Sequence, residues 1–195
     1  MRHRSEPEPN LVMDRSLALK AASLFLLGML LCSPAMAAEP KAAPPFSLWT
    51  LDRRLHTLSS LLEGKRFVVL SFFATWCAPC RAELPLLSKV HERFSGQGVE
   101  VVLLAVDEDR AKLEAFLKEH PLPLLVLSDP YAVAAKAYGL VENGLVRVPR
   151  TFVLDAAGRQ VASFEASAEL DQKLGALLAP KPEPTARSKK KGNKR

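Results

Sequence analysis

The stretch Trp76-Cys77-Ala78-Pro79-Cys80 joins a run of apolar residues to an amphipathic segment. Residues 67–73, before it, are almost entirely apolar, which is typical of a strand that is covered on both faces. After it, apolar residues recur at helical spacing between residues 82 and 94. The two cysteines are therefore predicted to lie in the first turn of a helix, directly after a buried strand.

A cysteine in the first turn of a helix is expected to be reactive. The unpaired N–H groups and the positive dipole end of a helix N-terminus stabilise a thiolate relative to a thiol. We expect Cys77 to be the exposed nucleophile and Cys80, one turn deeper, to close a disulfide with it. The alternative is a buried pair of inert thiols, which the strand–Cys-x-x-Cys–helix arrangement disfavours.

A Trp-Cys-x-Pro-Cys sequence after a hydrophobic strand resembles the thioredoxin superfamily, and within it the extracytoplasmic TlpA/ResA-like thiol–disulfide oxidoreductases. The resemblance covers residues 45–178. It implies an α/β, thioredoxin-like fold: a central mixed β-sheet flanked by helices, with an N-terminal hairpin and a central helix–strand insertion.

The remaining sequence also alternates between strand and helix patterns, which favours an α/β fold with a mixed sheet. An acidic triplet at residues 107–109 is expected to cap the helix that follows it. The first predicted elements are a hairpin (46–51 and 55–58), buried strands (100–106 and 122–127) and helices (110–120 and 131–138). They are followed by a second hairpin, whose first strand lies within residues 146–155 and whose second is 160–164, and by a closing helix (168–178).

Four regions are predicted along the chain. Residues 1–38 contain basic residues, an uncharged apolar run and a small-x-small site, which indicate a signal peptide or, because of the length of the run, a signal anchor. The other regions are a linker (39–45), the thioredoxin-like domain (46–180) and a disordered basic tail (181–195).

The formal net charge of +6 originates in the tail, where residues 181–195 include seven Lys or Arg and one Glu. The rest of the chain is close to neutral, so no nucleic-acid-binding face is expected. The tail is predicted to be solvated, with weak contact to an anionic membrane surface as the alternative. His56, His91 and His120 occur singly, so no metal site is predicted.

The sequence Val148-Pro149-Arg150 resembles the segment that carries a cis-proline opposite the cysteine pair in thioredoxin folds. A cis-proline turns the backbone and has no N–H, so the backbone of Val148 can pair with an incoming peptide. A trans-proline that starts a strand is the alternative. Relatives commonly have Thr where this chain has Arg150. The cation is expected to stabilise the Cys77 thiolate, to select acidic substrates or to point to solvent.

Glu83 lies three residues after Cys80 and shares a helix face with it. By the resemblance, an acid at this position assists proton transfer during thiol exchange. Thioredoxin uses a buried Asp on the preceding strand, where this chain has Ser71. The alternative is that Glu83 only complements the helix dipole. Trp76 is expected either to shield the thiols and form part of the docking surface or only to pack.

The leading hypothesis is an extracytoplasmic (periplasmic) thiol–disulfide oxidoreductase. The resemblance implies a reductase of protein disulfides, for example in cytochrome c maturation, that a membrane-embedded electron donor recharges. The Cys77–Cys80 disulfide would be the only redox group, without a separate cofactor. Two rivals share the fold: a thiol peroxidase that uses Thr75 and Arg81, and a copper-handling module, against which the two-residue spacing of the cysteines counts.

Overall fold

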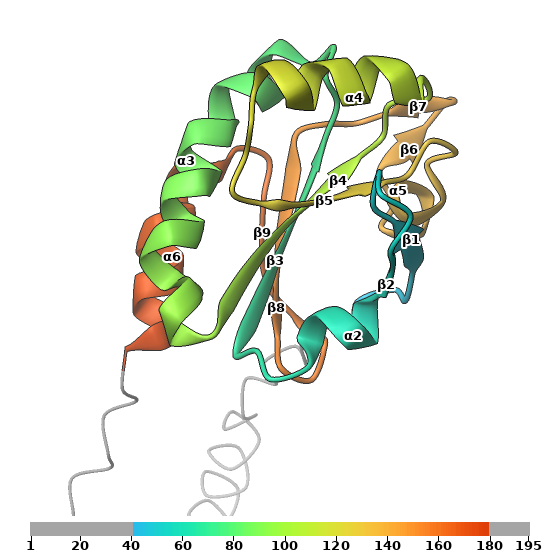
Figure 1. Ribbon diagram of the computed structural model, residues 1–195. Coiled ribbons are helices and arrows are strands. Elements are labelled where there is room, and N and C mark those ends of the chain that lie inside the picture. The colour runs from blue at the N-terminus through green and yellow to red at the C-terminus, as the bar shows by residue number, and fades with distance from the viewer. Residues whose placement is uncertain (1–40, 180–195) are drawn as a thin grey trace, which may run out of the picture. The chain divides into compact units, whose positions relative to one another are not determined.

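A seven-stranded mixed β-sheet forms the centre of the computed structural model, which describes residues 41–179 (Figure 1). The strand order is β2-β1-β5-β4-β3-β8-β9. Strands β5, β4 and β3 are parallel, whereas β1, β2, β8 and β9 run antiparallel to their neighbours. These strands are β1 (Ser47–Trp49), β2 (Leu55–Thr57), β3 (Phe67–Phe73), β4 (Val99–Ala105), β5 (Leu125–Ser128), β8 (Arg150–Asp155) and β9 (Gln160–Phe164).

Strand β3 is buried along nearly its whole length because its side chains are apolar on both faces. Consecutive residues of a strand point to opposite faces. The ring of Phe73 accordingly lies 6.5 Å from that of Phe116 in α4 (Arg110–Glu119), while the ring of Phe72 lies 5.2 Å from that of Tyr138, just after α5 (Val133–Ala137). Both faces of β3 are thus covered.

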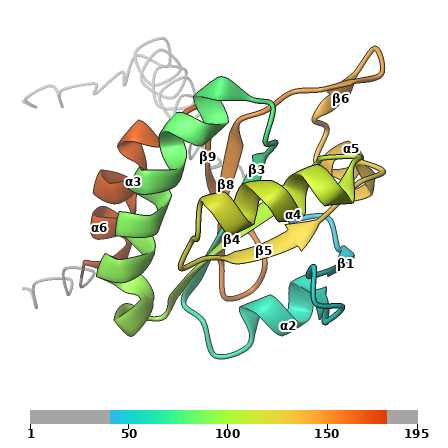
Figure 2. The same ribbon diagram turned by 45° about the horizontal axis from the view of Figure 1, so that its top comes forward.

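The long helix α3 (Ala78–Phe94) follows β3 and remains one helix through Pro85. It lies beside the closing helix α6 (Leu170–Leu178) in both ribbon views (Figures 1 and 2). Arg93 and Asp171 join the two helices by a 2.6 Å ion pair. The remaining elements are α2 (Leu58–Leu62), η1 (Ser95–Gln97), η2 (Ser167–Glu169) and a small separate hairpin of β6 (Val141–Glu142) and β7 (Leu145–Val146).

The predicted α/β architecture is confirmed, including the hairpin β1–β2, the central β5–α5 unit and the closing hairpin and helix. The β6–β7 hairpin was not predicted. Part of the expected linker packs on the domain, because Ala43 N–H donates to Gly158 O and Gln160 N–H donates to Lys41 O, each at 2.8 Å.

Between residues 41 and 179, no helix has the length and apolar character that crossing a membrane requires. The predicted signal segment, residues 1–38, and the predicted basic tail, residues 181–195, lie outside the described residues.

Candidate active site

The pairing of β3 with β8 brings together the two segments that the sequence singled out. Phe72, near the end of β3, lies opposite Arg150, the first residue of β8. Because the two strands are antiparallel, the segment that follows β3 meets the segment that precedes β8. Cys77 and the Val148–Pro149 peptide are therefore neighbours, although 71 residues separate Cys77 from Val148.

Cys77 and Cys80 form a disulfide at the beginning of α3, with a Cα–Cα distance of 5.2 Å. Cys77 is the N-cap residue of the helix, and its Sγ accepts the N–H of Cys80 at 3.2 Å. A backbone N–H of the helix start therefore points at the sulfur, which is the arrangement that stabilises negative charge there.

The predicted exposure of Cys77 is only partly observed. Cys77 is 6% exposed and Cys80 is 1% exposed, so Cys77 is the more accessible sulfur but is far from open. The reason is the neighbouring backbone of Val148, because Cys77 Sγ lies 3.7 Å from the carbonyl oxygen of that residue. An attacking sulfur must approach along the side that this segment leaves free.

The Val148–Pro149 peptide bond is cis, the isomer that the resemblance implies. Within residues 41–179, the N–H of Val148 donates to no backbone carbonyl. Val148 thus presents an unpaired backbone beside the disulfide, which is the requirement for pairing with an added strand.

Glu83 extends from α3 to the turn η2 rather than standing alone at the helix start. Its two carboxylate oxygens accept the N–H and the hydroxyl of Ser167, each at 2.9 Å. Ser167 is fully buried, and its hydroxyl lies 3.2 Å from that of Thr151. Thr151 in turn donates to Ser71 Oγ at 3.0 Å. A line of buried hydroxyl groups therefore joins Glu83 to Ser71, the residue that the resemblance places at the position of the thioredoxin Asp.

The residues of the acidic triplet bond to two different segments, which corrects the prediction that the triplet only caps a helix. Asp109 is the N-cap residue of α4, as expected. Asp107 is buried and instead accepts the N–H of Thr75 at 3.0 and 3.1 Å and the Thr75 hydroxyl at 2.5 Å. Asp107 thereby fixes the loop that leads into Trp76 and Cys77.

Trp76 and Arg150, which were both predicted to bind substrate, have different surroundings. Trp76 is among the exposed large apolar side chains, so its ring is available for contact with another molecule. Arg150 donates to Glu165 at 3.0 Å and its guanidinium lies 5.8 Å from the centre of the Phe152 ring. The Arg150 side chain is 29% exposed and ion-paired, so of the three roles predicted for this cation it does not simply point to solvent.

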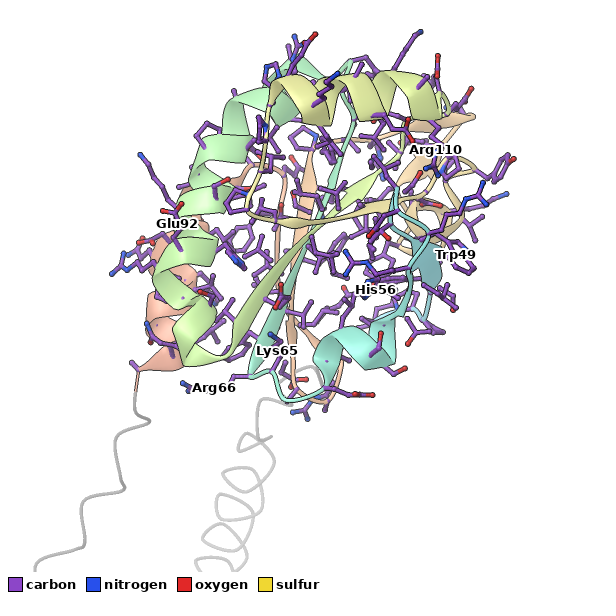
Figure 3. All side chains as sticks on the ribbon, viewed as in Figure 1. Trp49, His56, Lys65, Arg66, Glu92 and Arg110 are labelled. Atoms are coloured by element: carbon purple, nitrogen blue, oxygen red, sulfur yellow. A yellow bond between two sulfur atoms is a disulfide. The ribbon has the colours of Figure 1, made fainter. Side chains whose placement is uncertain are left out.

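A cavity of about 900 Å³ is lined by Trp49, Arg110 and Tyr131, among others. Figure 3 labels Trp49 on β1 and Arg110 at the start of α4. Neither cysteine lines this cavity. Within residues 41–179, His, Cys, Asp and Glu side chains form no cluster of three that could hold a metal ion.

Comparison with known proteins gives the family of this chain. The family profile described as "AhpC/TSA family" matches residues 40–162. The thiol-disulfide oxidoreductase ResA of a Bacillus cereus strain is 30% identical over 137 residues, which cover 70% of this chain and 75% of that protein. ResA of Bacillus subtilis (strain 168) is 32% identical over 124 residues, which cover 64% of this chain and 65% of that protein. The chain belongs to the AhpC/TSA family, in its TlpA/ResA-like branch.

Solved structures give the same fold for this TlpA/ResA-like protein. A thiol:disulfide interchange protein of the thioredoxin family from Chlorobium tepidum TLS is 30% identical, with a TM-score of 0.60, over 72% of this chain and 98% of that one. A thiol:disulfide interchange protein from Bacteroides sp. is 19% identical, with a TM-score of 0.63, over 77% and 97% of the two chains. The fold is thioredoxin-like, and the chain is a thiol–disulfide oxidoreductase.

Two residues of this TlpA/ResA-like site were missed in the sequence. Ser167 lies 84 positions from Glu83, and no local pattern pointed to their contact. Asp107 lies 32 positions from Thr75 and was assigned to the following helix. The sequence did contain a signal for Asp107, because this residue follows a buried parallel strand. Polar side chains that follow such strands gather at one edge of the sheet and often contact one another.

The Asp107–Thr75 contact yields a first prediction. Asp107→Ala leaves the N–H and the hydroxyl of Thr75 without their acceptor, so the free energy of unfolding should fall by about 2 kcal/mol. Because the loop before Cys77 is then less fixed, exchange with a small uncharged disulfide should slow about tenfold.

The matched control is Asp109→Ala, which removes the α4 cap for about 1 kcal/mol and leaves the loop intact. Denaturant unfolding and stopped-flow exchange rates measure the two effects. An Asp107→Ala protein that exchanges at the wild-type rate would show that Asp107 does not position the loop.

Proposed function

We propose that the protein is an extracytoplasmic protein-disulfide reductase that uses Cys77 and Cys80 as its dithiol. The observation that carries the proposal is the Cys77–Cys80 disulfide at the N-terminus of α3, opposite the unpaired backbone of Val148 and the cis peptide at Pro149. The names of the curated relatives support the oxidoreductase chemistry.

In the proposed reaction the Cys77 thiolate attacks one sulfur of the substrate disulfide. That S–S bond breaks, one substrate thiolate leaves with the electron pair, and a mixed disulfide forms on Cys77. The Cys80 thiol then loses its proton and attacks Cys77 Sγ, which releases the second substrate thiolate. The two thiolates gain protons, so the substrate is reduced by two electrons and the dithiol becomes the disulfide.

Glu83 is the carboxylate that we assign to the Cys80 proton. It lies on the same helix, three residues beyond Cys80, and a general base of this kind accelerates a step by about 10²–10⁴-fold. The two hydrogen bonds from Ser167 hold the carboxylate in one orientation. Ser167 is therefore a positioning residue for Glu83.

Substrate docking in this proposal combines backbone and aromatic contacts. An extended substrate segment pairs with the free backbone at Val148, which places its disulfide over Cys77. The exposed ring of Trp76 adds apolar contact beside the sulfurs. Backbone pairing of this kind depends little on the amino-acid sequence of the substrate. Side chains of the protein near Val148 must therefore supply the specificity.

The cellular setting is part of the proposal and follows from the resemblance. Residues 1–38 would export or anchor the chain, and a membrane-embedded electron donor would restore the dithiol in the oxidising compartment. Cytochrome c maturation is one process that needs such a reductant. The basic residues 181–195 would add weak contact with an anionic membrane surface.

The rival peroxidase hypothesis meets a geometric objection. A peroxidatic site that used Thr75 would need its hydroxyl free for the peroxide, but this hydroxyl donates to Asp107 at 2.5 Å. Arg81 is exposed on the first turns of α3. Turnover of hydrogen peroxide by the purified protein, absent in this account, tests that alternative.

Trapping of the mixed disulfide tests the proposed order of attack. Cys32, the third cysteine of the chain, lies in the predicted signal segment and is replaced by Ser so that it cannot react. In this Cys32→Ser background, Cys80→Ser should accumulate a stable mixed disulfide with a peptide disulfide, because the resolving thiol is missing. Cys77→Ser should form little, since Cys80 is almost fully buried. Intact-mass spectrometry measures both adducts. Equal trapping by the two variants would contradict the assignment of Cys77 as nucleophile.

The role of Glu83 is tested by the pH dependence of the resolving step. Glu83→Gln should slow reduction of a small disulfide about 10²-fold at pH 7, and the deficit should shrink as pH rises because hydroxide then removes the proton from Cys80. Ser167→Ala should slow the same reduction by a smaller factor, and its pH profile should have the same form as that of Glu83→Gln.

Glu92→Gln is the matched control, because Glu92 is an exposed residue of the same helix (Figure 3). It should retain the wild-type rate and pH profile. A Glu83→Gln rate that is lower by the same factor at every pH would assign Glu83 a structural role only.

A further inference from the structure

Three buried hydroxyl groups, which we call the hydroxyl line (Ser71, Thr151 and Ser167), lead from the sheet to Glu83. Thr151 Oγ1 in β8 donates to Ser71 Oγ in β3 at 3.0 Å, and it lies 3.2 Å from Ser167 Oγ in η2. The Ser167 hydroxyl contacts Glu83 Oε2 at 2.9 Å. Each residue of the line is at most 1% exposed, so bulk water does not reach these groups.

The surroundings of Ser71 are otherwise apolar. Residues 69, 71 and 73 of β3 point to the same face of the sheet, and Val69 and Phe73 are apolar and almost fully buried. A hydroxyl in such surroundings costs free energy unless it is hydrogen-bonded, and apolar groups of the same shape serve stability about equally well. Stability alone therefore does not account for three hydroxyls in this place.

The bonds of the hydroxyl line differ from those of other buried polar side chains. In the part of the chain that the structure describes, the others bond to backbone groups of a turn, a loop or a helix start; they are Thr50, Asp107 and Asp129. Within residues 41–179, the hydroxyls of Ser71 and Thr151 bond only to each other and to Ser167. These two hydroxyls thus act only along the line that ends at Glu83.

The number of hydrogens in the line depends on Glu83. The line contains three oxygen–oxygen contacts, and each hydroxyl has one hydrogen to donate. An ionised Glu83 can only accept, so Ser167 donates to it. Because Thr151 donates to Ser71, the contact between Ser167 and Thr151 then lacks a hydrogen. A proton on Glu83 supplies it, since Glu83 then donates to Ser167, Ser167 to Thr151 and Thr151 to Ser71.

The remaining contact of Glu83 suits both of its forms. The N–H of Ser167 donates to Oε1 at 2.9 Å, and this oxygen stays an acceptor whether or not Oε2 carries a proton. Among residues 41–179 Glu83 forms no ion pair with the charged residues of the elements packed around it; these are Arg81, Lys89, Arg150, Glu169, Asp171 and Lys173. Ser167 therefore supplies the hydrogen bonds of the carboxylate in the described chain, and the hydroxyl line lies behind it.

We propose that the hydroxyl line, through Thr151, stabilises the proton that Glu83 takes from Cys80 in the resolving step. The inference rests on the proposed function and adds Thr151 to it as a positioning residue. In this step the S–H bond of Cys80 breaks and its proton passes to Glu83. The electron pair stays on the Cys80 sulfur, which attacks Cys77 Sγ. The hydroxyl hydrogens only turn from one oxygen to the next, so no electrons pass along the line.

The test measures the resolving step by itself. The reduced full chain in a Cys32→Ser background is mixed rapidly with hydroxyethyl disulfide, which is small and uncharged. Acid quenching followed by mass spectrometry separates the mixed disulfide from the reduced and oxidised forms. At high disulfide concentration the first attack no longer limits the reaction, so the observed rate levels off at the rate of resolution. This plateau rate is measured at neutral and at alkaline pH.

Thr151→Val keeps the shape of the side chain and removes its hydroxyl. This variant should resolve about fivefold more slowly at neutral pH, the equivalent of one ordinary hydrogen bond, and the deficit should shrink as the pH rises. Thr151→Ser retains the hydroxyl and should resolve at nearly the wild-type rate. In a Glu83→Gln background, Thr151→Val should have no further effect, because the line then has no proton to stabilise.

Thr50→Val is the matched control, because Thr50 is also buried and its hydroxyl donates to the backbone of Arg54 in the first hairpin. It should retain the wild-type plateau rate and pH profile. Denaturant unfolding shows which variants are folded. If Thr151→Val does not fold, Ser71→Ala takes its place, since it removes the acceptor of the same hydroxyl.

The inference is overturned if Thr151→Val resolves at the wild-type rate. It is also overturned if the deficit is equal at every pH, is shared by Thr151→Ser or persists in full in the Glu83→Gln background, since each of these results assigns Thr151 a structural role only. Resolution by the wild-type protein leaves the proposed function standing in all of these cases. If hydroxyethyl disulfide does not oxidise the wild-type protein at all, the proposed function itself fails.

Discussion

The antiparallel pairing of β3 with β8 is the constraint on which the rest of the site depends. It aligns Phe72 with Arg150, so that the strand leading to Cys77 and the strand that follows Pro149 meet at one edge of the sheet. A shift of this register by two residues would move Val148 about 7 Å along the sulfurs. The pairing is secured by burial, because both strands are almost entirely enclosed and a one-residue slip would move every side chain to the opposite, differently packed face.

Polar contacts then fix the two sides of the disulfide segment within this apolar frame. Asp107, from the end of β4, holds the loop that enters the segment, and Ser167, from η2, holds Glu83 on the helix that leaves it. Unpaired polar groups are expensive in such surroundings, so satisfied networks of this kind give a site one geometry.

The sequence predicted the parts of the structure that local patterns encode. Apolar runs and helical spacing located β3 and α3, and the resemblance located the cis peptide at Pro149. The contact of Ser167 with Glu83 could not be predicted, because it depends on how α6 packs beside α3. The limited exposure of Cys77 has the same origin, since the segment that covers it precedes β8 and lies 71 residues away in the sequence. Long-range contacts, rather than local propensity, decide these features.

The direction of electron flow is the central claim, and the equilibrium reduction potential of the Cys77–Cys80 pair tests it most directly. A helix N-terminus stabilises the thiolate and thereby makes the pair more oxidising, so the fold by itself allows either direction. Equilibration of the Cys32→Ser protein in glutathione buffers gives the value. The account predicts a potential near that of thioredoxin, about −270 mV, as a reductant of protein disulfides requires. A potential near about −120 mV would mean that the protein introduces disulfides and would contradict the account.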